Sequence, residues 1–171
     1  MQVWTLIKEK VNCGVSAVGK CRLYLNTLQN KCENQMLVCG RVNPPPVEKN
    51  GVFFGVQDNF QDKAKSLKGL PLQVEHNSKC RVGKVISGWV SPEDGAMWAL
   101  AEINTCELGG AVAAAAVEKG CFNEFSLGYK AQMYRNPLSG SIEVGNKDIL
   151  ELSIVKKGAR DGCKIMYKEK K

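Results

Sequence analysis

A turn between two β-like runs is the feature that most constrains the fold of this chain. Ser91-Pro-Glu-Asp-Gly95 places an Asp-Gly step shortly after a proline, which is typical of a tight reversal of the backbone. The runs at 81–90 and 97–103 on either side are rich in the residues that favour strands. The centre of the chain is therefore predicted to be a β-hairpin.

A helix is predicted directly after this hairpin. Asn104 can cap its first turn, with Glu107 three residues on in the capping-box position. Residues 111–119 are mostly alanine and have very high helix propensity, and Gly120 then ends the helix. The predicted helix thus covers the stretch from Asn104 to Gly120.

Two further strands follow, at 121–129 and 149–155. In the first, strict alternation gives one face to the apolar side chains of Phe125, Leu127 and Tyr129. Ser126 and Gly128 point to the other face. In the second, the apolar face is formed by Leu150, Leu152 and Ile154. Glu151 and Ser153 share the opposite face, so alternation permits Ser126 and Glu151 to lie on one face of the sheet.

Length and composition favour a single folded domain over residues 1–171. Apolar residues make up 44% of the 171 residues and charged residues 24%, which is enough for a core and typical of an ordinary surface. An earlier strand is expected at 36–42, and a short apolar run follows at 51–56. A short helix is expected within 58–69. Together these elements predict an α+β domain with an antiparallel barrel or sandwich.

The charge pattern bears on partners. The net charge is +7, and part of the excess lies in the basic C-terminal tail, 163–171. Such a tail can contact nucleic acid or an acidic partner, but we interpret it as a solvated terminus. No aromatic residues are interleaved with the basic ones, so base stacking is not indicated. The first ten residues carry charges and no run reaches ~20 apolar residues, so neither a signal peptide nor a membrane helix is expected.

Two motifs point to cofactors only weakly. Eight cysteines without a Cys-x-x-Cys pair are interpreted as mostly reduced thiols, although a Cys₄ metal site stays open. Gly14-Val-Ser-Ala-Val-Gly-Lys-Cys21 matches the spacing of a phosphate-binding loop except at its end. There Cys21 replaces the Ser or Thr whose hydroxyl would hold magnesium.

Three residues are candidates for chemistry. His76 is the single histidine of the chain, and histidine is the usual general base near neutral pH. Ser126 can act as a nucleophile if a base lies beside it, and Gly128 would leave room for a substrate backbone. Glu151 can orient a histidine. Each also has an ordinary structural interpretation, as an exposed histidine or as a solvated strand residue.

Several segments in the order of the chain resemble the herpesvirus capsid-maturation proteases, the assemblins. Leu70-Pro-Leu-Gln-Val-Glu-His76 followed by Val82-Gly-Lys-Val85 resembles their histidine segment. Phe125-Ser-Leu-Gly-Tyr129 is also close to the serine segment of tailed-phage prohead proteases, which share that fold. Glu151-Leu-Ser-Ile-Val155 and Gly158-Ala-Arg-Asp-Gly162 resemble the segment of the third catalytic residue and the glycine–arginine loop after it. The resemblance covers about residues 70–162.

The resemblance implies Ser126 as nucleophile and His76 as base. The third member in herpesvirus enzymes is a second histidine, which this chain lacks, and Glu151 stands at the matching position. Four other carboxylates are rivals for that role: Glu102, Glu124, Glu143 and Asp148. The family loop implies that the backbone N–H of Ala159 and the side chain of Arg160 stabilise the oxyanion. No metal or organic cofactor is implied.

The implied fold is α+β, with a mainly antiparallel β-barrel core and a few surrounding helices. The implied function is a capsid-maturation serine endopeptidase that cleaves itself from a precursor and processes the internal scaffold protein. Its partners would be the scaffold protein and the capsid shell, inside an immature capsid in the host nucleus, or in the cytoplasm for a phage. Because the chain stops nine residues after Gly162, obligate dimerisation is not carried over from the family, and a homodimer stays open as a partner. The alternatives are a non-catalytic scaffold- or capsid-binding domain of the same fold, and a nucleotide- or nucleic-acid-binding protein.

Overall fold

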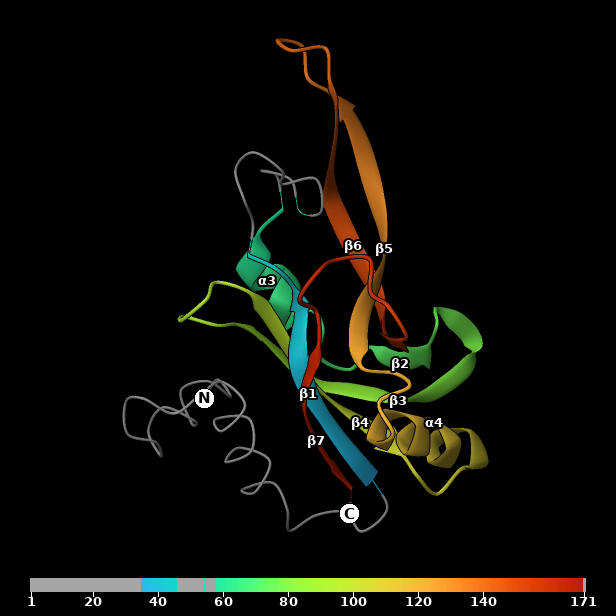
Figure 1. Ribbon diagram of the computed structural model, residues 1–171. Coiled ribbons are helices and arrows are strands. Elements are labelled where there is room, and N and C mark those ends of the chain that lie inside the picture. The colour runs from blue at the N-terminus through green and yellow to red at the C-terminus, as the bar shows by residue number, and fades with distance from the viewer. Residues whose placement is uncertain (1–34, 46–53, 55–57, 171) are drawn as a thin grey trace.

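The computed structural model describes residues 35–45, 54 and 58–170 (Figure 1). The described strands are β1 (Gln35–Asn43), β2 (Pro71–Val74), β3 (Asn77–Val90), β4 (Met97–Asn104), β5 (Glu124–Arg135), β6 (Ile142–Val155) and β7 (Ile165–Lys170). The described helices are α3 (Phe60–Lys65) and α4 (Leu108–Glu118). The predicted phosphate-binding loop at 14–21 and most of the apolar run at 51–56 lie outside the described residues.

One seven-stranded sheet organises the domain, in the order β5-β6-β2-β3-β4-β1-β7. The central hairpin predicted around 91–95 is confirmed as β3 and β4, paired antiparallel. The strands are antiparallel except for β2 and β6, which run parallel through Leu72↔Leu152, Gln73↔Ser153 and Val74↔Ile154. The sheet is therefore mixed, and it brings the end of β2 alongside the end of β6.

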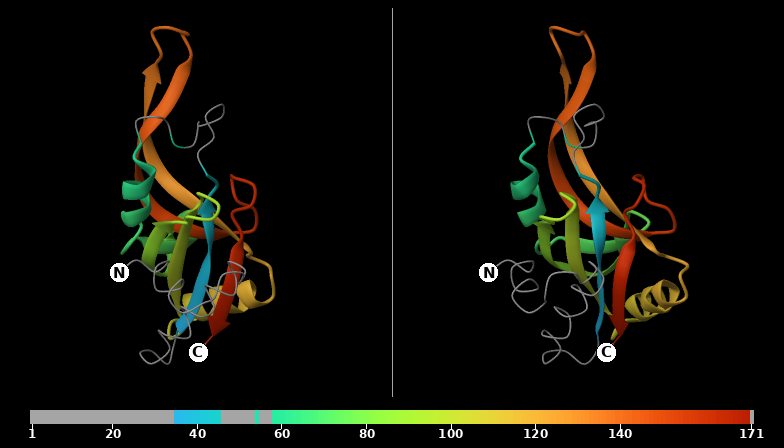
Figure 2. Two further views of the ribbon diagram at one scale, coloured as in Figure 1. Left: turned by 90° about the vertical axis from the view of Figure 1, so that its left-hand side faces the viewer. Right: turned by 60° about the vertical axis from the view of Figure 1, so that its left-hand side comes forward.

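The expected antiparallel barrel is not closed. The first residues of β5 approach the start of β7 through a single bridge, Glu124↔Lys164. The backbone N–H groups of Phe125 and Ile165 donate across the same gap to the carbonyls of Cys163 (2.7 Å) and Asn123 (2.9 Å). Beyond this point the β5–β6 hairpin extends away from the rest of the sheet as a long arm, which Figure 2 shows from two further sides. Past the bridge between Glu124 and Lys164, β5 and β7 do not pair, so the sheet stays open.

The helices pack at opposite ends of the β3–β4 hairpin. α3 lies against β3 so closely that a Cβ at Gly88 would be 2.3 Å from the Ala64 carbonyl oxygen. The capping prediction for α4 is wrong. Asn104 is the last residue of β4, and its side chain accepts from the Cys106 N–H at 3.0 Å to form a turn. The helix begins only at Leu108, after Glu107, which makes no side-chain cap.

A β-bulge turns Leu150 away from the core face on which it was predicted. Gly128 pairs with Glu151, and the next residue Tyr129 pairs with Ile149, so Leu150 has no partner on β5. An extra residue of this kind reverses the alternation locally. Leu150 is consequently 45% exposed, while Ile149 is 9% exposed and joins the core.

The basic end of the chain is a strand rather than a solvated terminus. Residues 165–170 pair with β1 as β7. The Lys168 ammonium group donates to the carbonyls of Val117 (2.7 Å) and Glu118 (3.0 Å) at the end of α4. The Val117 carbonyl also accepts from the Gly120 N–H at 3.1 Å. A cation at this end of the helix complements its dipole. Part of the lysine excess thus stabilises the fold.

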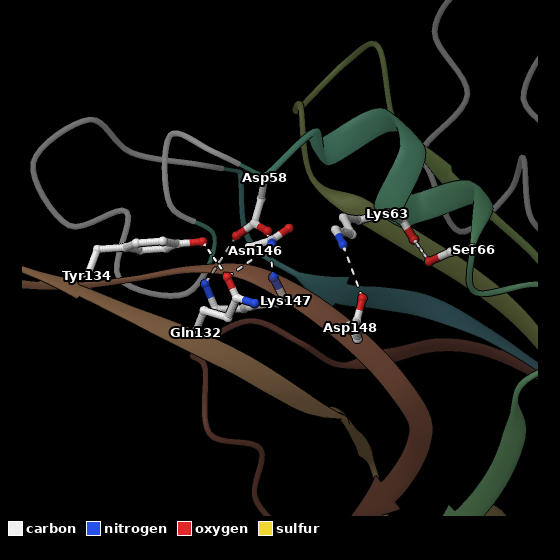
Figure 3. Close-up of polar contacts among 8 residues, drawn as sticks. All are labelled: Asp58, Lys63, Ser66, Gln132, Tyr134, Asn146, Lys147 and Asp148. Atoms are coloured by element: carbon white, nitrogen blue, oxygen red, sulfur yellow. Dashed lines mark hydrogen bonds and ion pairs between the residues drawn. The ribbon is translucent and has the colours of Figure 1, made fainter.

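A buried ion pair attaches the segment before α3 to the base of the arm. Asp58 and Lys147 have fully buried side chains, and Lys147 Nζ lies 3.4 Å from Asp58 Oδ2. Figure 3 shows the two side chains pointing toward each other beside β6. Lys147 Nζ also lies over the rings of Phe54 (5.1 Å) and Tyr129 (5.8 Å), which favours the charged amine.

Within the described residues, no helix is long and apolar enough to cross a membrane.

Candidate active site

Three side chains from separate elements meet at the junction of β2, β5 and β6. Ser126 Oγ lies 2.9 Å from His76 Nε2. The other ring nitrogen of His76, Nδ1, is hydrogen-bonded to Glu151 Oε1. The structure thus brings together three of the residues predicted from the sequence, as a hydroxyl, an imidazole and a carboxylate in line.

Ser126 is placed by the alternation of β5. Its neighbours Phe125 and Leu127 are buried in the core, at 0% and 6% exposure. The Ser126 side chain therefore lies on the opposite face of the strand, where it pairs across the sheet with Ser153. β5 is the last strand on this side of the sheet, so the nucleophile candidate stands on an edge strand.

His76 is placed by a two-residue turn between β2 and β3. Glu75 and His76 connect the pair Val74↔Asn77, and both have positive φ, 49° and 57°. A hairpin turn with positive φ at both central residues usually contains glycine or asparagine, because other side chains are disfavoured there. The surrounding contacts must therefore hold this turn in place.

Those contacts come from β6 and from the residue that follows it. The Glu75 N–H donates to the Ile154 carbonyl at 3.1 Å, and the Glu75 carboxylate accepts from the Lys156 N–H at 2.8 Å. The His76 N–H donates to Ser153 Oγ at 3.1 Å. Because β2 runs parallel to β6, all three contacts lie at the same end of both strands. They fix the His76 side chain, which is 43% exposed, beside Ser126.

Glu151 is nearly buried and occupies a space left by a glycine. Its side chain is 10% exposed, and its second oxygen accepts from Ser153 Oγ at 2.6 Å. Gly128 lies directly opposite on β5, and a Cβ at that position would be 2.0 Å from Glu151 Oε1. The space at Gly128, expected to admit a substrate backbone, is filled by the Glu151 carboxylate.

The rival carboxylates are engaged elsewhere. Glu102 lies 3.5 Å from Lys84 Nζ, and Asp148 lies 3.8 Å from Lys63 Nζ (Figure 3). Glu143 accepts from Asn136 Nδ2 at 2.8 Å near the tip of the arm. The Glu124 carboxylate accepts a hydrogen bond from the backbone N–H of Gly158.

The Glu124 contact anchors the loop that follows β6. A Cβ at Gly158 would be 2.8 Å from the Phe125 carbonyl oxygen, so this loop runs beside the residue before Ser126. Ala159 is exposed and Arg160 is half-buried within it. The structure brings the loop to the serine strand, and the oxyanion role of Ala159 and Arg160 stays a prediction.

The cysteines of the described part offer no rival nucleophile at this loop. Burial raises the pKa of Cys163 to about 11, so its thiol stays protonated at neutral pH. Four of the described cysteines are free thiols: Cys80, Cys106, Cys121 and Cys163. Among the residues that the structure describes, no group of three or more His, Cys, Asp or Glu side chains could hold a metal ion.

Two residues of the site were not predicted in their present roles. Ser153 contacts both His76 and Glu151, and its position two residues after Glu151 on the same face was the only signal available. Gly128 was noticed, but its partner was not foreseen. Both roles depend on the register between β5 and β6, which single-sequence alternation does not give.

Comparison with solved structures identifies the fold. No family model matches the chain, and no curated protein matches it. The protease of Kaposi's sarcoma-associated herpesvirus (KSHV), in complex with a hexapeptide phosphonate inhibitor, aligns with a TM-score of 0.51 at 15% identity. The alignment covers 76% of this chain and 63% of that chain. This chain thus spans less than two thirds of the length of that protease.

A second structure of the same viral protease, in complex with an allosteric inhibitor, aligns with a TM-score of 0.47 at 12% identity, over 80% of this chain and 76% of that chain. The expected resemblance is confirmed at the level of the fold, which is that of the herpesvirus proteases. It is an α+β fold built on an open, mixed sheet rather than on a closed antiparallel barrel.

Proposed function

We propose that this protein is a serine endopeptidase with Ser126 as nucleophile, His76 as general base and Glu151 as the residue that orients His76. The observation that carries the proposal is the ordered contact of Ser126 Oγ with one nitrogen of His76 and of Glu151 with the other. A nucleophile, its base and a carboxylate behind the base are the arrangement that activates a serine hydroxyl.

The reaction proceeds through an acyl-enzyme. His76 Nε2 takes the proton of Ser126 Oγ–H as the oxygen attacks the scissile carbonyl carbon. The imidazolium that forms is stabilised by the Glu151 carboxylate at Nδ1. His76 then gives the proton to the leaving amine, and the peptide bond breaks. Water, deprotonated by His76, attacks the ester carbonyl and releases Ser126 and the new carboxyl end.

The stabilisation of the oxyanion is assigned to the loop after β6. The hydrogen bond from the Gly158 N–H to Glu124 and the close approach of Gly158 to the Phe125 carbonyl hold this loop beside the two residues that precede Ser126. We assign the Ala159 N–H and the Arg160 guanidinium as donors to the charged oxygen of the tetrahedral intermediate. No metal or organic cofactor takes part in these steps.

The substrate is assigned as an extended peptide. Ser126 stands on edge strand β5, and the sheet order places no other described strand beside the outer edge of β5 past its first residues. An extended peptide can add to such an edge by main-chain hydrogen bonds. The fold shared with a viral protease that binds a hexapeptide phosphonate supports this assignment. The natural substrates would be the precursor of this chain and a capsid scaffold protein, inside the immature capsid of an infected cell.

Reaction with a fluorophosphonate tests the nucleophile directly. Such reagents form a covalent phosphonyl ester with an activated serine, and the mass of the adduct and its peptide location identify the residue. We expect modification at Ser126 in the wild type and none in Ser126→Ala. In His76→Ala and Glu151→Gln the rate should fall by about a thousandfold or more. Ser141→Ala, in the exposed turn of the arm, is the matched control and should react as the wild type does.

Self-cleavage tests the biological assignment. The chain is expressed together with its downstream precursor sequence, and release is followed by mass. Release in the wild type with intact precursor in Ser126→Ala and His76→Ala is the expected result. If a wild-type protein that labels at Ser126 leaves the precursor and scaffold protein uncut, the substrate assignment is wrong. If Ser126 is not labelled at all, the assignment of Ser126 as nucleophile is wrong, and a non-catalytic scaffold- or capsid-binding domain becomes the favoured function.

A further inference from the structure

Ser153 is a fully buried hydroxyl with two partners in the candidate site. It lies on β6, is 0% exposed, and faces Ser126 across the sheet. Its Oγ lies 3.1 Å from the backbone nitrogen of His76 and 2.6 Å from Glu151 Oε2. Neither the resemblance nor the proposed mechanism assigns it a role.

The direction of each hydrogen bond follows from the chemistry of the groups. A backbone N–H can only donate, so Ser153 Oγ accepts from His76. The hydroxyl has one proton, and an ionised carboxylate only accepts, so that proton goes to Glu151 Oε2. The other oxygen of Glu151 then accepts from His76 Nδ1–H. The contacts close a ring that starts at the backbone of His76 and returns to its side chain.

This ring holds two features that the reaction needs. The bond to the His76 backbone stabilises a residue at φ 57° in the two-residue turn. The bond to Glu151 Oε2 fixes the carboxylate so that Oε1 faces Nδ1 of the imidazole. With the proton held on Nδ1, Nε2 presents its lone pair to Ser126 Oγ at 2.9 Å.

We propose that Ser153 is a positioning residue that fixes the tautomer and the orientation of His76 by linking the His76 backbone to the Glu151 carboxylate. The proposal rests on the proposed function, because it assumes that His76 acts as the general base for Ser126. A buried serine whose hydroxyl is merely satisfied would affect stability alone. A positioning residue also changes which nitrogen of His76 carries the proton.

The single histidine of the chain makes this measurable. In protein labelled with ¹⁵N at histidine, every imidazole signal belongs to His76, and its two ¹⁵N shifts report the tautomer. We compare the wild type with three variants of position 153. Ser153→Ala removes the hydroxyl, Ser153→Cys keeps similar bulk with a weak donor, and Ser153→Thr keeps the hydroxyl. Ser91→Ala is the matched control, since Ser91 is 2% exposed and its hydroxyl accepts from the Glu93 N–H outside the site.

We expect the Nδ1–H tautomer to dominate in the wild type, Ser153→Thr and Ser91→Ala. In Ser153→Ala and Ser153→Cys the Nε2–H tautomer should appear beside it. Fluorophosphonate labelling of Ser126 should slow by about tenfold to a hundredfold in these two variants, the loss expected for one hydrogen bond to a charged group. If Ser153→Ala disturbs folding, the comparison is made with Ser153→Cys alone.

The proposal is overturned if Ser153→Cys keeps the wild-type tautomer and labels Ser126 within twofold of the wild-type rate. It is also overturned if Ser153→Thr and Ser153→Cys give the same tautomer ratio of His76 and the same labelling rate of Ser126. The failure of the proposed function looks different. In that case wild-type Ser126 does not react, while the histidine spectrum still responds to Ser153→Cys.

Discussion

Gly128 and Glu151 lie directly opposite each other on β5 and β6, and the Glu151 carboxylate fills the space that a side chain at 128 would take. The distance from a Cβ at Gly128 to Oε1 would be 2.0 Å, and to the carboxyl carbon 2.7 Å. The same oxygen contacts His76 Nδ1. The absence of a side chain at one residue of the serine strand is thus what allows the carboxylate to stand behind the histidine.

Gly128→Ala should inactivate the site while leaving the domain folded. The added methyl group must displace the carboxylate, which hydrogen bonds to Ser153 and His76 hold in place. A displacement of about 1 Å in a catalytic array reduces rates by about a hundredfold, so labelling of Ser126 should slow by at least that factor. Gly109→Ala, whose Cβ would meet nothing within 4 Å, should label at the wild-type rate.

The measurements are the labelling rate and the unfolding midpoint in urea for each variant. Equal labelling rates in Gly128→Ala and the wild type would mean that Glu151 can serve His76 from another position. The assignment of Glu151 would then need revision.

Glu75 should matter for activity through its backbone anchor rather than through its charge. Its carboxylate accepts from the Lys156 N–H and so ties the turn that carries His76 to the end of β6. Glu75→Ala loses this bond and should slow labelling of Ser126 severalfold, whereas Glu75→Gln keeps an acceptor oxygen and should stay close to the wild type. A parallel drop in both variants would show that the negative charge matters instead.

The strands that carry the site could be predicted because their signal is local. Alternation over 125–129 identified the core face and left Ser126 on the other. Phe125 and Leu127 are buried as predicted, and Ser126 is buried too, at 7% exposure, because its own face is covered at the site. The turn chemistry of 91–95 correctly predicted the β3–β4 hairpin. These signals need only neighbouring residues, which a single sequence contains.

The parts that could not be predicted depend on pairing between distant segments. Leu150 became exposed because a bulge interrupts the register of β5 and β6. The Glu75–His76 turn has positive φ without glycine or asparagine, since contacts from β6 stabilise it. In these two cases tertiary contacts outweigh the local preference. Asn104 is different, because its side chain accepts from the Cys106 N–H in a local turn, and α4 begins only at Leu108.

The buried pair Asp58–Lys147 should be far more sensitive to single than to double substitution. Desolvation by burial lowers the pKa of Lys147 below its ordinary value of 10.5, although the Asp58 carboxylate opposes this shift. Removing either partner alone takes away the opposite charge 3.4 Å from the group that stays buried, and breaking a buried ion pair in this way destabilises a domain by about 3–5 kcal/mol. We therefore expect that loss in the free energy of unfolding for Asp58→Leu and for Lys147→Met.

The double variant Asp58→Leu with Lys147→Met should regain part of that stability, since an apolar pair of similar volume can replace a buried ion pair. The rest stays lost, because Asp58 Oδ1 also accepts from the Lys147 N–H at 2.7 Å and leucine cannot. Urea unfolding of the two single variants and the double variant measures the coupling. Strict additivity of the two losses would show that the ion pair itself contributes nothing.

Asp94 should give the fold a stability that is lost in acid. Its carboxylate accepts from Arg41 Nη2 (2.7 Å), the Ala96 N–H (2.9 Å) and Trp98 Nε1 (3.3 Å). Burial alone raises the pKa of Asp94, but the bonds from Ala96 and Arg41 outweigh it. The pKa in the folded state therefore lies below the ordinary value of 3.8.

A carboxyl group with a lowered folded-state pKa binds fewer protons when folded than when unfolded, so its contribution falls as the pH falls. The contribution is fully present above pH 3.8 and is lost as the pH drops through the folded-state value. Asp94→Asn should be less stable at pH 7 and should show a flatter decline of unfolding free energy below about pH 4. Arg41→Gln should flatten the same window, and adding it to Asp94→Asn should change the slope no further. Tryptophan fluorescence during urea unfolding at a series of pH values measures this, and a slope in Asp94→Asn equal to that of the wild type would contradict it.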